Sequence, residues 1–282
     1  MSKFLFSALS AAFCLFPAAP SIAAAAFEFG AGDLAPAVTF GAEGRLTPDE
    51  FARRNHLDAG DVRRRHAASG VVRCGSVRGA GQITLSDDVI TTAAHVFYDQ
   101  NGKLRASGST CVFIAEVAGE ESTTLIEVGT IIAGTTTPYR DAAVHDWAVA
   151  KLARPLHGAL PYGLAREAHS DAPIRFAARG HSDWGAGAGM SLEACRLRQA
   201  LDLGAEGTRE FAFDCAAGLG ASGAALLTPG GSNLVAVFVG FRSANPDRGF
   251  AFSPDHYNFA VTVEGAFRRA VERVAGAEAA GL

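Results

Sequence analysis

Ile-Thr-Thr-Ala-Ala-His (90–95) predicts a short strand that runs through two small residues into a histidine. Further along the chain, Asp-Trp-Ala-Val-Ala-Lys-Leu (146–152) predicts a second strand, which begins with an aspartate. Gly-Leu-Gly-Ala-Ser-Gly-Ala-Ala (218–225) then places a serine in a turn between glycines. A histidine, an aspartate and a serine therefore follow one another in that order.

These three residue types form a catalytic set. A serine hydroxyl is a poor nucleophile until a base takes its proton, and an imidazole does so well only when a carboxylate holds its tautomer. We interpret Ser222 as the nucleophile, His95 as the base and Asp146 as the carboxylate. Gly220 and Gly223 let the backbone bend, so that the amides of Gly220 and Ser222 can face one developing oxyanion.

Each residue has a simpler interpretation. His95 is one of eight histidines, and the serine turn occurs in a chain with 32 glycines. Asp141 competes with Asp146 as the carboxylate, but it begins a polar turn, whereas Asp146 precedes an apolar strand that would bury it. The order His, Asp, Ser excludes the α/β-hydrolase and subtilisin arrangements. A lipase is also excluded because Ala224 stands where its motif needs glycine.

The segments resemble those of trypsin-like (chymotrypsin-fold) serine proteases, in particular the bacterial V8-like branch. In that branch a Cys-Arg and an Asp-Cys segment precede Gly-x-Ser-Gly, and this chain has Cys195-Arg196 and Asp214-Cys215. The resemblance covers about residues 71–274. It implies an all-β fold of two six-stranded antiparallel β-barrels with a C-terminal α-helix. It also implies a serine endopeptidase, a hydrolase that acts on protein or peptide substrates through an acyl-enzyme, without a cofactor.

The serine loop departs from the family pattern. Ala221 replaces an aspartate that pairs with a new N-terminus in digestive members, and Ala224 and Ala225 stand where Gly and Pro are usual. These departures keep open an alternative, a protease-like binding protein with weak or no catalysis. By analogy, the specificity pocket has Ala216 at its base and a wall of Val239, Gly240 and Phe241.

Because the residue at the bottom of this pocket is uncharged, we expect a preference for small or apolar P1 residues. Recognition of an acidic P1 residue through Arg242 or His181 is the alternative. The net charge of -4 and the pI near 6.1 argue against nucleic acid as a partner. Neither His-Glu-x-x-His nor Cys-x-x-Cys occurs, so no metal site is predicted.

The first 25 residues resemble a secretory signal peptide. They contain Lys3, an apolar run over 4–16 and small residues over 18–26. We expect a secreted or periplasmic monomer that has no membrane association after signal removal. Four cysteines then remain, which allow three pairings. The family resemblance favours Cys74 with Cys111 and Cys195 with Cys215.

The composition and periodicity of the sequence divide the rest of the chain into two parts. Residues 26–70 are predicted to be an N-terminal arm or propeptide, with a helix over Pro48–Asn55 capped by Thr47 and a possible processing site at Arg63–Arg65. Residues 71–282 form the protease-like domain, with barrel 1 at about 71–153 and barrel 2 at about 164–262. Short apolar runs separated by turn residues indicate the strands. They lie at 81–85, 89–93, 111–117, 124–132, 147–152, 174–178, 191–197, 211–213, 224–227, 234–241 and 258–261. An apolar stripe predicts a final helix at about 263–280.

Overall fold

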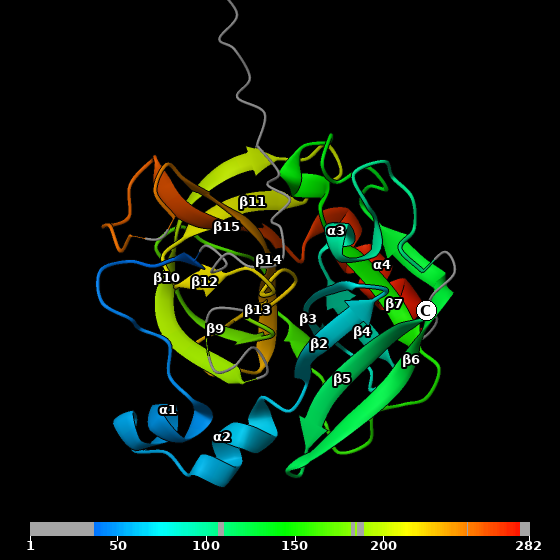
Figure 1. Ribbon diagram of the computed structural model, residues 1–282, viewed down its shortest axis with the longest axis horizontal. Coiled ribbons are helices and arrows are strands. Elements are labelled where there is room, and N and C mark those ends of the chain that lie inside the picture. The colour runs from blue at the N-terminus through cyan, green and yellow to red at the C-terminus, as the bar shows by residue number, and fades with distance from the viewer. Residues whose placement is uncertain (1–36, 107–109, 182–183, 185–188, 247, 277–282) are drawn as a thin grey trace, which may run out of the picture.

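The computed structural model describes residues 37–106, 110–181, 184, 189–246 and 248–276. The predicted signal peptide at 1–25 lies outside these residues. Two β-barrels stand side by side, with strands of barrel 2 on the left of Figure 1 and strands of barrel 1 on the right.

Barrel 1 closes six antiparallel strands in the order β2, β3, β4, β7, β6, β5. They are β2 (Ser69–Cys74), β3 (Val77–Ile83), β4 (Val89–Thr92), β5 (Cys111–Val117), β6 (Glu120–Ala133) and β7 (Ala148–Leu152). Alternate side chains fill the interior, as the two-residue period of a strand requires. In β5, Cys111, Phe113 and Ala115 are buried, and the residues between them are partly exposed.

Barrel 2 closes in the order β13, β9, β10, β11, β15, β14, because β13 also pairs with β14. Its strands are β9 (Pro173–Arg179), β10 (Met190–Leu203), β11 (Arg209–Phe213), β13 (Ala225–Leu227), β14 (Asn233–Ser243) and β15 (His256–Thr262). The short strand β8 (Gly163–Leu164) adds to β14 in parallel. With the C-terminal helix, these two barrels confirm the predicted fold class.

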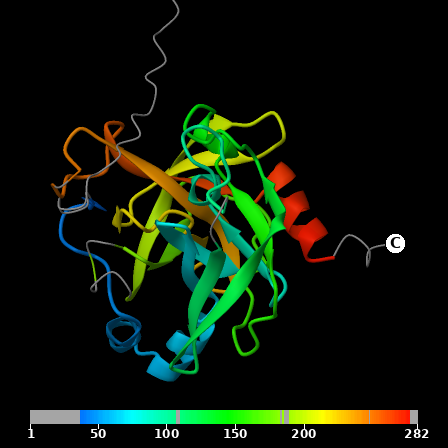
Figure 2. The same cartoon turned by 45° about the vertical axis from the view of Figure 1, so that its right-hand side comes forward.

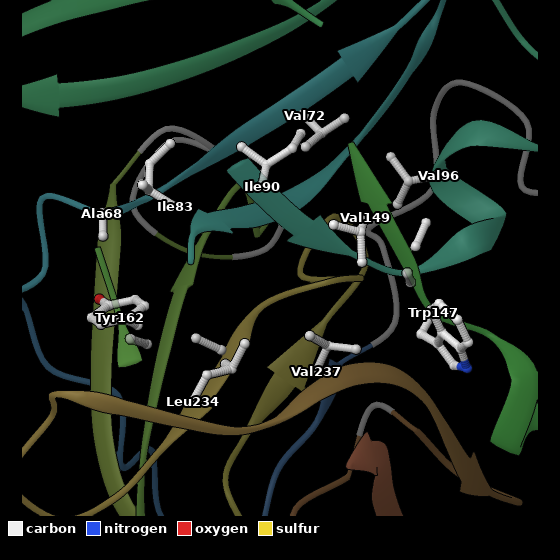
Figure 3. Close-up of a cluster of buried hydrophobic side chains, with 14 of the residues drawn as sticks. Ala68, Val72, Ile83, Ile90, Val96, Trp147, Val149, Tyr162, Leu234 and Val237 are labelled. Carbon is white, nitrogen blue, oxygen red and sulfur yellow. The ribbon is translucent and has the colours of Figure 1, made fainter. Parts of the chain in front are cut away.

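A shared apolar core joins the barrels. Ile83, Ile90 and Val149 come from barrel 1, and Leu234 and Val237 come from β14 of barrel 2; all five have 0% exposed surface. Figure 3 shows these side chains gathered between the strands of the two barrels. Burial of branched apolar side chains at this seam stabilises the fold by about 1.5–3 kcal/mol for each side chain.

The C-terminal helix α4 (Gly265–Val274) packs against barrel 1, as Figures 1 and 2 show in red. Its predicted apolar stripe is confirmed, since Phe267, Ala270 and Val271 are buried. The Phe267 ring stacks on Trp147 with 4.8 Å between centroids and 12° between planes. Because Trp147 directly follows Asp146, α4 supports the strand start that carries this carboxylate.

The N-terminal arm contains β1 (Ala37–Val38), α1 (Pro48–Arg54) and α2 (Ala59–Arg65). Thr47 caps α1 as predicted: its hydroxyl accepts from the Glu50 amide, and the Glu50 carboxylate accepts from the Thr47 amide. The sequence did not predict α2, whose last turn contains Arg63–Arg65. No helix in the described ranges is long and apolar enough to cross a membrane.

Two disulfides and three short elements complete the frame around the site. Cys74 is bonded to Cys111, which joins β2 to β5, and Cys195 is bonded to Cys215, which joins β10 to the segment before the serine turn. The short elements are α3 (Ala94–Phe97), the 3-10 turn η1 (Ala143–His145) and β12 (Ala217–Gly218).

Candidate active site

The structure brings His95 and Asp146 together by two hydrogen bonds. His95 Nδ1 lies 2.7 Å from Asp146 Oδ2, and the His95 backbone N–H donates to Asp146 Oδ1 at 2.9 Å. Because one carboxylate contacts both the ring and the backbone of the same residue, it cannot rotate without breaking a bond. With Nδ1 as donor to Asp146, Nε2 is the nitrogen that can accept a proton.

Local structure explains this geometry. His95 lies in the first turn of α3, and the residue that caps this helix, Ala93, has no side chain that can accept from the first amides. Asp146 supplies the missing acceptor from the segment that precedes β7, the strand paired with β4. Asp146 itself is 6% exposed and follows η1, whose turn aims its side chain back toward α3.

Asp141, the competing carboxylate, lies elsewhere. It is exposed, and it accepts hydrogen bonds from the hydroxyls of Thr135 and Thr137. These bonds lower the pKa of Asp141, since they stabilise its charged form. Its role is therefore to hold a surface turn, and no contact among the described residues joins it to His95.

Ser222 lies in the second of two consecutive turns, which span residues 218–221 and 221–224. The Ala221 amide donates to the Gly218 carbonyl at 3.2 Å, and the Ala224 amide donates to the Ala221 carbonyl at 2.8 Å. Gly220 and Gly223 occupy the third position of these turns, with φ of 88° and 90°. Type II turns require positive φ at this position, and glycine adopts it without strain.

The serine turn is pressed against barrel 1. The Ala80 amide donates to the Ser222 carbonyl at 2.7 Å, and the Gly223 amide donates to the Phe238 carbonyl of β14 at 2.7 Å. A side chain at Gly223 would collide with the Thr92 hydroxyl and the Ala80 carbonyl. The strand end that precedes His95 and the residue after Ser222 are therefore in direct contact.

Two backbone donors beside Ser222 have no partner. Within the part of the chain that the structure describes, neither the Gly220 amide nor the Ser222 amide has an acceptor. Unpaired amides on a tight turn can bind a negatively charged oxygen. No hydrogen bond joins Ser222 Oγ to the His95 ring among these residues, and catalytic contacts of this kind are often longer without substrate.

The four predicted pocket residues lie on two segments that flank the serine turn. Ala216 is 1% exposed and directly precedes β12, whereas Val239, Gly240 and Phe241 belong to β14. Asn258 of β15 links the segments, since its side-chain amide donates to the Cys215 carbonyl at 2.6 Å and its backbone is the register partner of Phe241.

Both residues proposed to recognise an acidic P1 side chain already contact other groups of the protein. Arg242 donates to the Tyr257 hydroxyl at 2.7 Å and lies 3.6 Å from Glu210. His181 has 0% exposed surface, and its two ring nitrogens contact the Gly218 amide and the Ser191 hydroxyl. His181 thus lies behind the serine turn.

Two residues beside His95 carried no signal in the sequence. Arg105 Nε donates to the His95 carbonyl at 3.3 Å, and Arg105 also donates to the Tyr139 hydroxyl at 3.1 Å. The Tyr139 ring lies 6.1 Å from the His95 ring. These contacts join loops that are separated in the sequence, so no local pattern could reveal them. No cluster of metal-binding side chains occurs among the described residues.

Solved structures of other proteins share this fold. A Glu endopeptidase in complex with MPD matches with a TM-score of 0.63 and 12% identity, over 85% of this chain and 100% of the other. A thermostable serine protease, AL20, from an extremophilic microorganism matches with a TM-score of 0.58 and 15% identity, over 76% of this chain and 99% of the other. The fold is that of the chymotrypsin-like serine proteases. At these identities the comparison concerns the fold alone. No family model matches the sequence, and no match was found among curated proteins.

In this chymotrypsin-like fold, a half-buried acid lies behind the serine turn. Glu193 of β10 accepts a hydrogen bond from the Ala216 amide at 2.8 Å. Burial raises the pKa of Glu193 to about 7; the Ala216 hydrogen bond opposes the increase, and the nearby Glu43 adds to it. The segment before Ser222 is therefore attached to a group that titrates near neutral pH.

Proposed function

We propose that this protein is a serine endopeptidase. The observation that carries the proposal is the His95–Asp146 pair, which is joined by two hydrogen bonds. It lies beside a turn that carries Ser222 and two unpaired amides. The fold alone does not determine the activity, because proteins of one fold have many different activities. The site geometry therefore carries the argument.

The chemistry follows from the positions of the groups. As Ser222 Oγ attacks the scissile carbonyl carbon, its proton passes to His95 Nε2, and Asp146 stabilises the imidazolium that forms. The carbonyl oxygen becomes negative and accepts hydrogen bonds from the Gly220 and Ser222 amides. When the C–N bond breaks, His95 returns the proton to the leaving amine and an acyl-enzyme remains. Water then attacks the acyl carbon while His95 takes its proton. As the bond from that carbon to Ser222 Oγ breaks, His95 returns the proton to Oγ, which releases the acid and restores the Ser222 hydroxyl.

Fluorophosphonate labelling tests this proposal. Only an activated serine rapidly displaces fluoride from the probe and forms a stable adduct. We expect one adduct on the wild-type protein by intact mass, and none on Ser222→Ala. Asp141→Asn is the matched control, because it removes a nearby carboxylate that does not contact His95, and it should label at the wild-type rate. Rapid labelling that persists in Ser222→Ala would refute the assignment.

A binding protein without catalysis is the second candidate, supported by the alanines at 221, 224 and 225. Their structural environment weakens this support. Ala221, Ala224 and Ala225 are at most 1% exposed and fill space beneath the serine turn and at the start of β13. Absence of an adduct on folded wild-type protein would favour this candidate over the endopeptidase.

For specificity, we propose a preference for small or apolar P1 residues. Ala216 brings no charge to the pocket base, and the Phe259 ring lies against Gly240, so that a Cβ there would come within 2.7 Å of it. Cleavage of a peptide library should show such residues on the acyl side. Preference for Glu, Lys or Arg at P1 would contradict this proposal.

We further propose that residues 1–25 direct export and are removed. The two disulfides support an oxidising destination, where such bonds persist. The mass of the exported protein should match a chain that begins near residue 26 and lacks four thiol hydrogens. A mass that includes residues 1–25 would contradict removal.

A further inference from the structure

The turn before Ser222 needs external support, because glycine-rich backbone has many accessible conformations. In digestive members of this fold class an aspartate occupies the position of Ala221, which here is buried and uncharged. Downstream of this residue, Ser222 and Gly223 are tied to barrel 1 and β14. Upstream, the segment 216–220 must be held by other groups.

One dipeptide contacts two residues of the turn at 218–221. The Gly218 amide points at His181 Nδ1 at 3.3 Å. A Cβ on the preceding residue, Gly180, would lie 3.0 Å from the Gly220 carbonyl oxygen. Gly180 and His181 therefore form the surface on which residues 218–220 pack.

Hydrogen bonding fixes the state of the His181 ring. A backbone N–H can only donate, so Nδ1 must be an acceptor when it meets the Gly218 amide. The proton then lies on Nε2, which donates to Ser191 Oγ at 3.0 Å. The ring is fully buried, so neither nitrogen exchanges its partner for bulk water.

Arg45 of the N-terminal arm completes the arrangement. Its guanidinium is buried, with 3% of the side chain exposed, and Nη1 lies 3.5 Å from His181 Nδ1. Glu43 binds the other side of the guanidinium through Nε at 2.8 Å and Nη2 at 2.7 Å. A guanidinium can only donate, so Arg45 Nη1 and the Gly218 amide both require Nδ1 to be an acceptor.

The arm also contacts the same segment through its backbone. Strand β1 pairs with β12, with Ala37 opposite Gly218 and Val38 opposite Ala217. Figure 1 shows the blue chain leaving the region of β12 and passing around the outer side of barrel 2 to α1. Residues 37–46 are thus built into the fold beside the serine turn.

We propose that Arg45 and His181 are positioning residues that hold Gly218, and through the 218–221 turn orient the Gly220 amide toward the substrate oxygen. This inference rests on the proposed endopeptidase function. It assigns to the arm a task that a carboxylate at position 221 would otherwise perform. It also requires the active protein to retain residues 37–46, which are part of the segment that the sequence left open as a propeptide.

The test compares two replacements of His181. His181→Asn offers a side-chain oxygen that can accept from Gly218, whereas His181→Phe keeps a ring and removes the acceptor. We expect His181→Phe to lower the fluorophosphonate labelling rate and kcat by about a hundredfold to a thousandfold, the range for loss of an oxyanion donor, with a much smaller change in KM. His181→Asn should recover at least half of that loss on a logarithmic scale.

A second readout separates positioning from stability. Affinity for a peptide aldehyde, whose adduct has an oxyanion, should fall in parallel with kcat/KM across the variants, while thermal unfolding follows neither. Arg45→Met, which keeps length but removes charge, provides a variant outside the ring and should lower labelling less than His181→Phe. Ser191→Ala, which contacts only Nε2, should have the smallest effect.

The outcomes distinguish this inference from the function on which it rests. If folded wild-type protein forms no Ser222 adduct, the proposed function fails and this inference fails with it. If wild-type protein labels and His181→Phe labels equally fast, only the inference is refuted. Equal losses in His181→Asn and His181→Phe would also refute it, because the acceptor would then have no role.

Discussion

Gly223 lies where the chain leaves no room for a side chain, directly after the proposed nucleophile. Its φ is 90°, and an added Cβ would meet the Thr92 hydroxyl, the Ala80 carbonyl and the Ala93 amide. We expect Gly223→Ala to displace the serine turn and to reduce fluorophosphonate labelling about a hundredfold, as a misplacement of about 1 Å can do.

Gly119 provides a matched control for that substitution. Its φ is 85°, but nothing lies within 4 Å of an added Cβ. Gly119→Ala should therefore carry only the left-handed backbone cost of about 1–2 kcal/mol and should label at the wild-type rate. If both variants label equally well, close approach at Gly223 does not position Ser222.

Glu193 makes stability depend on pH. Burial raises its pKa from the ordinary 4.5 to about 7, so the folded chain binds this proton more tightly than the unfolded chain. Its contribution to stability is then fully present below about pH 4.5 and is lost as the pH rises through about 7. Glu43, Arg45 and Asp214 are the charged groups that act on it.

Glu193→Gln removes this titration and keeps an oxygen for the Ala216 amide. At pH 8.5 we expect the variant to unfold at a higher temperature than the wild type, by roughly 2–4 °C for each kcal/mol relieved. Near pH 4.5 the two melting temperatures should converge. A difference that stays constant from pH 4.5 to 9 would show that the Glu193 charge is not responsible.

At the scale of elements, α4 connects the end of the chain to the start of β7. The buried Phe267 ring stacks on Trp147, next to Asp146. We expect Phe267→Ala to lower the free energy of unfolding by about 3–5 kcal/mol, measured by denaturant titration. Arg269→Ala, on the exposed side of the same helix, should change it by about 0.5 kcal/mol or less. Comparable losses in both variants would argue that helix formation, rather than the ring stack, stabilises this element.

Elements with strong local patterns were predictable from the sequence. Strands such as β5 and β14 carry apolar runs bounded by turn residues, and α4 carries an apolar stripe. Strand β2 was missed because it begins with Ser69 and Gly70, which favour turns in isolation. Helix α2 was missed because Val62 is its only buried residue, too little for a periodic signal.

The candidate site divides in the same way. His95, Asp146 and Ser222 lie in local motifs from which their chemistry can be predicted, and the glycines at 220 and 223 predict sharp turns. By contrast, Arg45 and His181 are 136 residues apart in the chain. Their contact lies beside the pairing of β1 with β12, and two-residue strands have no sequence pattern of their own. Groups that support a site from distant segments therefore need the structure to be found.

At the scale of the molecule, the two barrels share one core and cannot unfold independently without exposing it. Leu234 of β14 has no exposed surface and belongs to the same cluster as Ile83 and Ile90 of barrel 1. Helix α4 adds a second link, since it packs on barrel 1 while the Ala266 amide donates to the Glu206 carbonyl between β10 and β11. We therefore expect a single cooperative transition in calorimetry.

Leu234→Ala tests this coupling, because it removes side-chain volume from barrel 2 at the seam. The loss should be about 2–5 kcal/mol, the range for large-to-small changes in a core. If the seam couples the barrels, the variant still unfolds in one transition, at a lower temperature. Leu203→Ala, on a side chain that is 66% exposed, should leave that temperature nearly unchanged. Two separate transitions in Leu234→Ala, or already in the wild type, would show that each barrel is stable alone and that the site between them is held by local contacts only.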